Sequence, residues 1–339
     1  MKKLEKVYNW KQVEEAKTYL RKFWAGDYSL AYSCYPVKPE YRQLEDEEEM
    51  IDKTARNILK GAELPGFNIP HFIADFGTVS IPAYWGGERY TPEGGKMVIS
   101  PLIESSEEVD EIEPVPPEKG DAGRAVKIWK EISCRLQTDN LTCSFIDMQG
   151  PLNTASLLWK QDEFMIAMHK HPEKVHQLLE QVTDQIIKIY KYMINKIGEK
   201  NIFGSLWPYI WLPPDIGVKI VEDYMPLLSP ELYREFGLPY LEKISEEIGA
   251  IFIHCCGDYS HQLDNLKNSS INLLGLEFHS PYMNPEELFD KFQDKVFVPF
   301  GCEVNELVRM DKGDNRLWFV LNDETKEIKK KVKFIYNNL

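Results

Sequence analysis

The chain has 339 residues, of which 54 are acidic and 40 are basic, so its formal net charge at pH 7 is −14. Binding to a nucleic-acid backbone depends on clustered Lys and Arg, and this composition argues against such a surface. With 43% hydrophobic and 28% charged residues, the chain has the proportions of a globular protein that can bury a large core.

The sequence indicates a location in a reducing compartment. Its first residues, MKKLEKVYNWKQVEEAKTYL, contain no apolar stretch typical of a secretory signal. No later run approaches the roughly 20 apolar residues that span a bilayer. The six cysteines lack the spacing of a disulfide framework. We therefore expect a cytoplasmic protein whose thiols are free for metal binding or chemistry, with no membrane partner.

Several short apolar runs predict buried strands, because each is rich in Ile, Val, Leu and Phe and is followed by loop residues rather than by a hairpin turn. These runs are 69–76, 142–147, 201–206, 249–256, 271–277 and 296–301. Helical patterns lie at 151–168, 172–197, 230–248, 258–268 and 285–294. Strands that alternate with helices run parallel, so the sequence predicts an α/β fold.

The strand count favours a barrel. Residues 29–36 are a possible first strand and 317–321 a further one, so that eight parallel strands could close into a TIM-type (β/α)8 barrel. We expect one structural domain, with an N-terminal helical extension at 1–68 that includes the possible first strand, and the barrel at 69–339. An amphipathic surface helix is expected at 323–338.

The strongest local signal for chemistry is the segment FIHCCG at 252–257, where a predicted buried strand ends. Side chains alternate along a strand, so His254 and Cys256 share one face while Cys255 points the other way. An imidazole and a thiolate on one face can bind the same zinc ion. The alternative is that both belong to the core, since free Cys is among the most buried residue types.

Two further candidate ligands follow the next predicted strands. Glu277 ends the strand 271–277, and Cys302 comes directly after 296–301. In a barrel, successive strand ends converge on one mouth, where the active sites of this fold lie. The sequence therefore predicts a zinc site formed by His254, Cys256 and Cys302, with Glu277 as a further candidate for a ligand or a catalytic group.

Carboxylates also end two earlier strands, at Asp75 and Asp147. An ionised carboxylate after an apolar run costs several kcal/mol unless it is paired or solvated. We expect Asp75 to be catalytic or to contact a ligand, and Asp147 either to bind substrate or to cap the following helix. Trp207, in an aromatic loop, could wall a pocket or pack as a lid.

Five segments, in order along the chain, carry a resemblance to a known family. They are GPLNTASLLW (150–159), HPEKVHQLLEQVTD (171–184), LSPELYREFGLPYLEKI (228–244), LLGLEFH (273–279) and FGCEVNELV (300–308). Over about residues 69 to 310 the chain resembles the uroporphyrinogen decarboxylase superfamily, which also contains zinc-dependent corrinoid methyltransferases. The resemblance implies a TIM-type barrel.

Decarboxylases of this superfamily carry an Arg-Gln-Ala-Gly-Arg motif, an aspartate that binds pyrrole NH groups, a tyrosine and a carboxyl-terminal histidine segment. Asp75 matches the aspartate, but Leu158 stands at about the tyrosine position. The arginine motif and the histidine segment have no counterpart. Because three of these four features are missing, decarboxylation of a tetrapyrrole is the alternative function that the resemblance implies, and not the leading one.

The methyltransferases carry His-x-Cys at a strand end, which His254 and Cys256 match. Their later Gly-Cys-Gly-like segment has no counterpart, and Cys302 or Glu277 would have to replace it. The resemblance implies zinc-dependent transfer of a methyl group between a corrinoid on a partner protein and a thiol or pterin acceptor. A non-catalytic relative that binds a ligand is a third class, because a fold does not fix a function.

Overall fold

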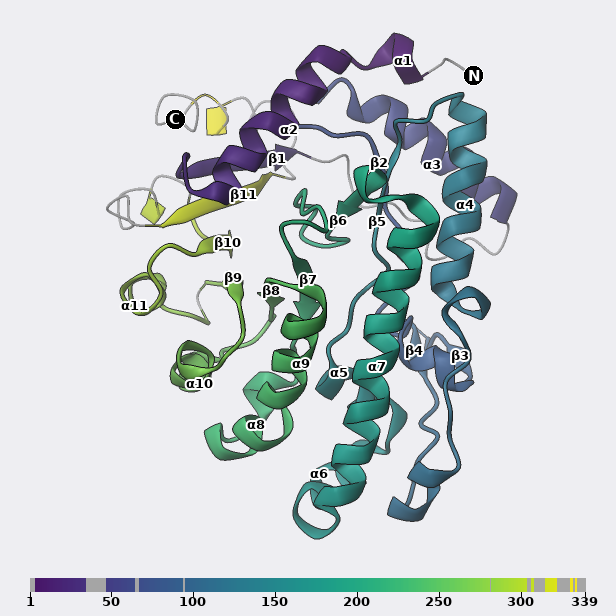
Figure 1. Ribbon diagram of the computed structural model, residues 1–339, viewed down its shortest axis with the longest axis vertical. Coiled ribbons are helices and arrows are strands. Elements are labelled where there is room, and N and C mark those ends of the chain that lie inside the picture. The colour runs from purple at the N-terminus through teal and green to yellow at the C-terminus, as the bar shows by residue number, and fades with distance from the viewer. Residues whose placement is uncertain are drawn as a thin grey trace.

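A computed structural model describes residues 4–34, 47–64, 67–93, 95–280, 282–303, 306–307, 315–321, 330–331 and 333. In this part of the chain, parallel strands alternate with helices, which confirms the predicted α/β fold. Figure 1 shows the strands near the centre of the molecule and the helices around them. Most of the helix expected at 323–338 lies outside the described residues.

The parallel strands form two sheets. The larger sheet has the order β1 (Leu30–Cys34), β11 (Arg316–Leu321), β10 (Val296–Phe300), β9 (Leu273–His279), β8 (Ile251–His254) and β7 (Val218–Val221). The smaller sheet has the order β2 (His71–Phe72), β5 (Thr142–Ser144) and β6 (Ile202–Gly204). A separate antiparallel pair consists of β3 (Arg89–Tyr90) and β4 (Val98–Ile99).

The segment after β5 joins the two parallel sheets. Gly150 N–H donates to the Val221 carbonyl at 2.8 Å, and Val221 N–H donates to the Met148 carbonyl at 3.0 Å. Among the pairings of the described residues, none joins β1 to β2, so the predicted barrel has a seam at this place. The chain before residue 69 contributes to the larger sheet, because β1 pairs in parallel with β11.

Eleven α-helices are present in the described residues. They are α1 (Leu4–Val7), α2 (Trp10–Ala25), α3 (Glu47–Gly61), α4 (Asp121–Leu136), α5 (Pro151–Leu158), α6 (Gln161–Lys170), α7 (Pro172–Ile197), α8 (Pro230–Phe236), α9 (Leu238–Ile248), α10 (Leu263–Asn268) and α11 (Pro285–Lys291). Short 3-10 helices are η2 (Pro82–Trp85), η3 (Ser106–Asp110), η4 (Pro117–Lys119), η5 (Glu199–Asn201), η6 (Met225–Leu227) and η7 (Ser260–Gln262).

Local sequence explains several helix boundaries. The Ser229 hydroxyl accepts the Leu232 N–H and so caps α8, as its position before a proline at the first helical turn suggests. The helix predicted at 151–168 is interrupted at Trp159, and the one predicted at 230–248 is divided at Gly237, which is followed by Pro239 in the first turn of α9.

The sequence analysis did not predict β7. The strand is only four residues long and contains Lys219, so it lacks a continuous apolar run. In the structure the Lys219 side chain is only 4% exposed and lies 3.5 Å from the Asp147 carboxylate. With β7, the two parallel sheets contain nine strands in the described residues rather than the expected eight.

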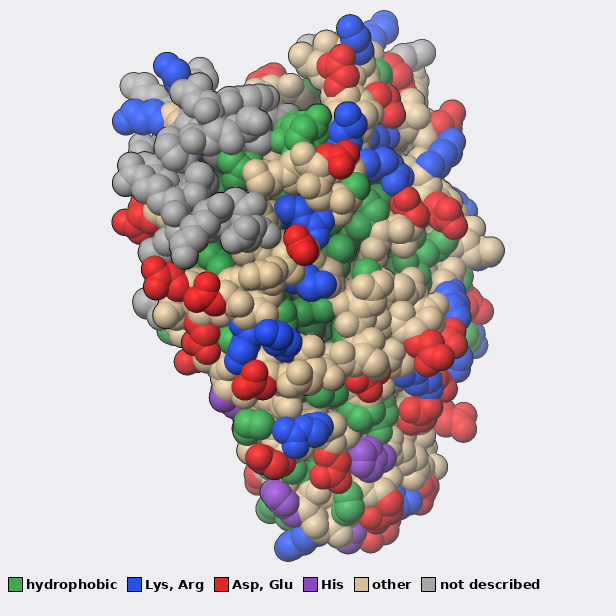
Figure 2. All heavy atoms as spheres, turned by 60° about the vertical axis from the view of Figure 1, so that its left-hand side comes forward, with side chains coloured by type: hydrophobic (Ala, Val, Ile, Leu, Met, Phe, Trp, Pro, Cys, Tyr) green, Lys and Arg blue, Asp and Glu red, His purple; other side chains and the backbone are tan. Residues whose placement is uncertain are grey.

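The core lies between the strands and the helices around them, where Phe252, Leu276, Val296 and Leu317 are completely buried. On the face shown in Figure 2, acidic and basic side chains are interspersed, and no large basic patch is visible. The described part of the chain contains no helix that is both long and apolar enough to cross a membrane.

Candidate functional site

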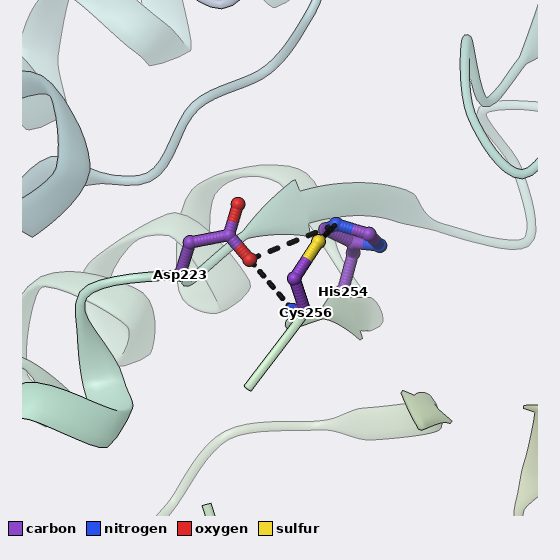
Figure 3. Close-up of side chains that lie close together, drawn as sticks. All are labelled: Asp223, His254 and Cys256. Atoms are coloured by element: carbon purple, nitrogen blue, oxygen red, sulfur yellow. Dashed lines mark hydrogen bonds and ion pairs between the residues drawn. The ribbon is translucent and has the colours of Figure 1, made fainter. Parts of the chain in front are cut away.

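Three potential metal ligands lie together at the carboxyl ends of β7 and β8. Asp223, His254 and Cys256 each present one ligand atom, and these atoms lie within 4.8 Å of one another. His254 Nε2 is 3.3 Å from Cys256 Sγ and 3.7 Å from Asp223 Oδ1. Figure 3 shows the three side chains converging. We call these three residues the ligand cluster.

Strand register explains why Asp223 belongs to the ligand cluster. β7 and β8 pair with Val221 opposite His254, so Asp223, two residues further, is level with Cys256. The Cys256 N–H donates to Asp223 Oδ1 at 2.7 Å. The Asp223 side chain is 40% exposed, which leaves the ligand cluster open to solvent on this side. Sequence reasoning missed Asp223 because it missed the strand that precedes it.

Glu277 contacts Nδ1 of His254, the ring nitrogen that does not face Cys256. β8 and β9 pair with Ile253 opposite Leu276, which brings His254 next to Glu277. His254 Nδ1 lies 2.6 Å from Glu277 Oε2, and the carboxylate is completely buried. Burial alone would raise the pKa of Glu277 and lower that of His254. The attraction between the negative carboxylate and the positive imidazolium acts in the opposite direction and is the larger effect. The pKa of Glu277 falls to about 2 and that of His254 rises to about 10.

The second oxygen of Glu277 contacts two aromatic side chains. Glu277 Oε1 lies 3.1 Å from His279 Nε2 and accepts a hydrogen bond from Trp207 Nε1 at 3.3 Å. The rings of Trp207 and His279 both stack on Phe300, with centroid distances of 5.2 and 5.1 Å. We call Trp207, His279 and Phe300 the aromatic wall. Sequence reasoning missed His279, although it lies two residues after Glu277 and therefore on the same strand face.

Asp147 belongs to a buried polar group deeper in the barrel. Its Oδ1 lies 3.5 Å from Lys219 Nζ, and its Oδ2 accepts a hydrogen bond from Gln149 Nε2 at 2.9 Å. The positive charge of Lys219 also contributes, after His254 and His279, to the lowered pKa of Glu277. The negative charge of Asp147 is thus compensated by a lysine. Asp147 does not cap the following helix, because α5 begins after Gly150 without a side-chain cap.

Two residues expected at the site lie outside the ligand cluster. The Asp75 carboxylate is buried and its Oδ1 accepts the Gly77 N–H at 3.0 Å, within a turn. Cys302 Sγ contacts the Phe300 carbonyl at 3.6 Å. Cys302 does not join His254 because it follows β10, and β9 separates β10 from β8. Cys255 is fully buried, as expected from its opposite strand face, and burial raises the pKa of its thiol.

Two solved structures are similar to this chain along most of its length. A methyltransferase from Methanosarcina mazei has a TM-score of 0.67 and 15% sequence identity, with 95% of this chain and 98% of that chain covered. A B12-independent methionine synthase from Shewanella sp. W3-18-1, in complex with selenomethionine, has a TM-score of 0.47 and 12% identity, with 90% and 95% covered. The first likeness supports the fold. A comparison with curated proteins finds no significant match.

One family matches more than half of the sequence. It is described as "Uroporphyrinogen decarboxylase (URO-D)", and the match covers residues 67–199 and 217–298. The matched ranges include every member of the ligand cluster together with Asp75, Asp147 and Glu277, whereas Trp207 and Cys302 lie outside them. The chain belongs to the uroporphyrinogen decarboxylase (URO-D) family.

Proposed function

We propose that this protein is a zinc-dependent methyltransferase that moves a methyl group between a corrinoid protein and a thiol or pterin acceptor. The observation that carries the proposal is the ligand cluster, which gathers an imidazole, a thiol and a carboxylate at the ends of two adjacent strands. The Methanosarcina mazei protein of similar fold is named a methyltransferase, which supports this class of reaction.

The ligand cluster fits a tetrahedral zinc site. Nitrogen and oxygen ligands lie about 2.0–2.2 Å from zinc and thiolates about 2.3 Å, so tetrahedral angles separate ligand atoms by about 3.3–3.6 Å. The separations of 3.3 Å from His254 Nε2 to Cys256 Sγ and 3.7 Å to Asp223 Oδ1 are close to these values. Three protein ligands leave a fourth position for substrate, which is the pattern of catalytic zinc sites.

Glu277 would orient the ring of His254 toward the metal. Metal-binding histidines usually give their other ring nitrogen to a carboxylate, which fixes the tautomer and the orientation of the ring. The 2.6 Å contact of Glu277 Oε2 with His254 Nδ1 has this form and leaves Nε2 facing Cys256. In this arrangement Glu277 positions a ligand and is not itself one.

When bound, zinc supplies a Lewis acid that lowers the pKa of a substrate thiol, so that the thiolate is available as a nucleophile at neutral pH. The exposed side chains of Asp223 and Cys256 leave an approach from solvent, which a corrinoid protein and an acceptor would share. The aromatic wall would exclude water on one side and offer apolar contact to the acceptor. Asp75 and Asp147 are proposed to bind substrate.

Decarboxylation of a tetrapyrrole is the alternative, and the geometry favours it less. A substrate with several carboxylates needs basic groups that pair with them. In the described residues the ion-pair partners of Glu277 are histidines, and no arginine is paired with Asp223 or His254. The buried Lys219 is engaged with Asp147.

Zinc content and methyl transfer test the proposal together. After dialysis against a weak chelator, we expect about one zinc per chain by mass spectrometry, and loss of zinc in Cys256→Ser. Cys255→Ser, a matched change on the opposite strand face, should retain it. With methylcobalamin and a thiol, the zinc-loaded parent should consume the methyl donor and Cys256→Ser should not. A parent without zinc, or equal turnover in both proteins, would contradict the proposal.

A further inference from the structure

Glu277 contacts two histidines, and only one of them belongs to the ligand cluster. Its Oε2 lies 2.6 Å from Nδ1 of His254, and its Oε1 lies 3.1 Å from Nε2 of His279. His279 is the last residue of β9, and its ring centroid is 6.4 Å from that of His254. The structure therefore places a second imidazole, held by the same carboxylate, beside the proposed zinc site.

The carboxylate determines which nitrogen of His279 carries the hydrogen. An ionised carboxylate can only accept hydrogen bonds, so in the neutral ring the hydrogen is on Nε2 and Nδ1 is a bare acceptor. The two nitrogens of an imidazole point in widely different directions, so Nδ1 is directed away from the carboxylate of Glu277. Phe300 packs against the ring at a centroid distance of 5.1 Å and limits its rotation.

Nδ1 of His279 is open to a ligand. The side chain of His279 is 25% exposed, whereas that of Glu277 is completely buried. Nδ1 has no hydrogen-bond partner among the described residues, and it is not one of the enclosed side-chain atoms that lack a partner. Solvent therefore reaches Nδ1, and a bound molecule could replace that solvent.

We propose that Nδ1 of His279 accepts a hydrogen bond from the methyl acceptor, and that the acceptor carries a hydroxyl or N–H group near its methyl-accepting atom. This inference rests on the proposed function and specifies the chemistry of the acceptor. The rings of His254 and His279 are close enough for one small molecule to reach both the metal and Nδ1. An acceptor without a donor group would displace water from Nδ1 and leave it unpaired, which weakens binding.

Two pairs of thiols test the inference. 2-Mercaptoethanol and 1-propanethiol have the same number of non-hydrogen atoms, but only the first has a hydroxyl group. 3-Mercapto-1-propanol and 1-butanethiol extend the comparison by one carbon. Isothermal titration calorimetry with the zinc-loaded, full-length protein measures the dissociation constants. For at least one pair, we expect the advantage of the hydroxyl thiol to be about fivefold greater in the parent than in His279→Phe, since one hydrogen bond is worth about that factor.

The comparison within each pair separates the role of Nδ1 from effects on the metal. His279→Phe also removes the contact with Glu277 Oε1, but a weakened zinc site would affect both thiols of a pair alike. Trp207→Phe is the matched control, because it removes the other hydrogen bond to the same oxygen and keeps Nδ1. In this variant the advantage of the hydroxyl thiol should equal that in the parent.

NMR of the parent protein labelled with 15N-histidine gives a direct signal, which decides if His279→Phe does not fold or does not hold zinc. The Nδ1 resonance of His279 should move further with a hydroxyl thiol than with its alkyl counterpart. An equal advantage in parent and His279→Phe for both pairs, or an Nδ1 resonance that responds alike to both kinds of thiol, would overturn the inference and leave the proposed function intact. A parent protein without zinc would overturn the proposed function, and this inference with it.

Discussion

His254 Nδ1 lies 2.6 Å from Glu277 Oε2, and the two side chains are 6% and 0% exposed. This buried pair joins the ends of the adjacent strands β8 and β9, at the inner side of the ligand cluster. Removing one partner of such a pair leaves the other buried without compensation, which typically costs 3–5 kcal/mol. The geometry of the proposed zinc site thus depends on a residue that need not touch the metal.

Glu277→Gln tests this dependence, because it keeps the size of the side chain and removes its charge. We expect the affinity for zinc to fall about 10- to 100-fold, as is typical when the carboxylate behind a metal-binding histidine is lost. Competition with a chelator measures this dissociation constant. Trp207→Phe removes the 3.3 Å hydrogen bond to Glu277 Oε1 but leaves the charge of Glu277 in place, and it serves as the control. Equal affinities in parent and Glu277→Gln would exclude a positioning role.

Asp223→Asn tests the third ligand. An amide is a poor zinc ligand, but its oxygen can still accept the hydrogen bond that the Cys256 N–H gives to Asp223. We therefore expect a folded protein with zinc affinity reduced at least about tenfold, in which Co²⁺ still shows the thiolate absorption of Cys256. Asp258→Asn changes a nearby carboxylate that bonds only to Ser260 in the described contacts, and should bind zinc like the parent. Parent-like affinity in Asp223→Asn would remove Asp223 from the proposed site.

The sequence could predict the parallel α/β order and the meeting of His254, Cys256 and Glu277. Each follows an apolar run, and the carboxyl ends of parallel strands lie at one edge. Asp223 could not be found in this way. The strand before it contains Lys219, whose burial is compensated by Asp147, a residue of the segment after β5 that only the folded structure brings near.

Cys302 lies outside the ligand cluster for a related reason. It does follow the end of a strand, as predicted, but the sequence alone does not show which strands are neighbours in the sheet. The order β10-β9-β8 puts a whole strand between Cys302 and His254.

Asp75→Asn tests whether this carboxylate binds substrate. The amide oxygen can still accept the Gly77 N–H, so we expect the turn to be retained and the variant to stay folded. If Asp75 contacts substrate, KM for the acceptor should rise about tenfold or more, because a charged hydrogen bond is lost. Denaturant unfolding and steady-state kinetics measure the two effects. A large loss of stability with unchanged KM would make Asp75 a structural residue of its turn.

The pH dependence of stability tests the neutral state of His71. Its pKa is about 4 in the folded protein, lowered by burial from the ordinary value of 6.5. As the pH falls below 6.5, the unfolded chain takes up a proton at His71 before the folded protein does. The free energy of unfolding is therefore unaffected by this group above pH 6.5 and decreases as the pH falls toward 4. The loss approaches about 3 kcal/mol at about 1.4 kcal/mol per pH unit. We expect urea unfolding between pH 7 and 4.5 to show this loss in the parent and in His171→Phe, an exposed control, but not in His71→Phe. If the free energy of unfolding depended on pH in the same way in the parent and in His71→Phe, the pKa of His71 would be equal in the folded and unfolded protein. The prediction would then be wrong.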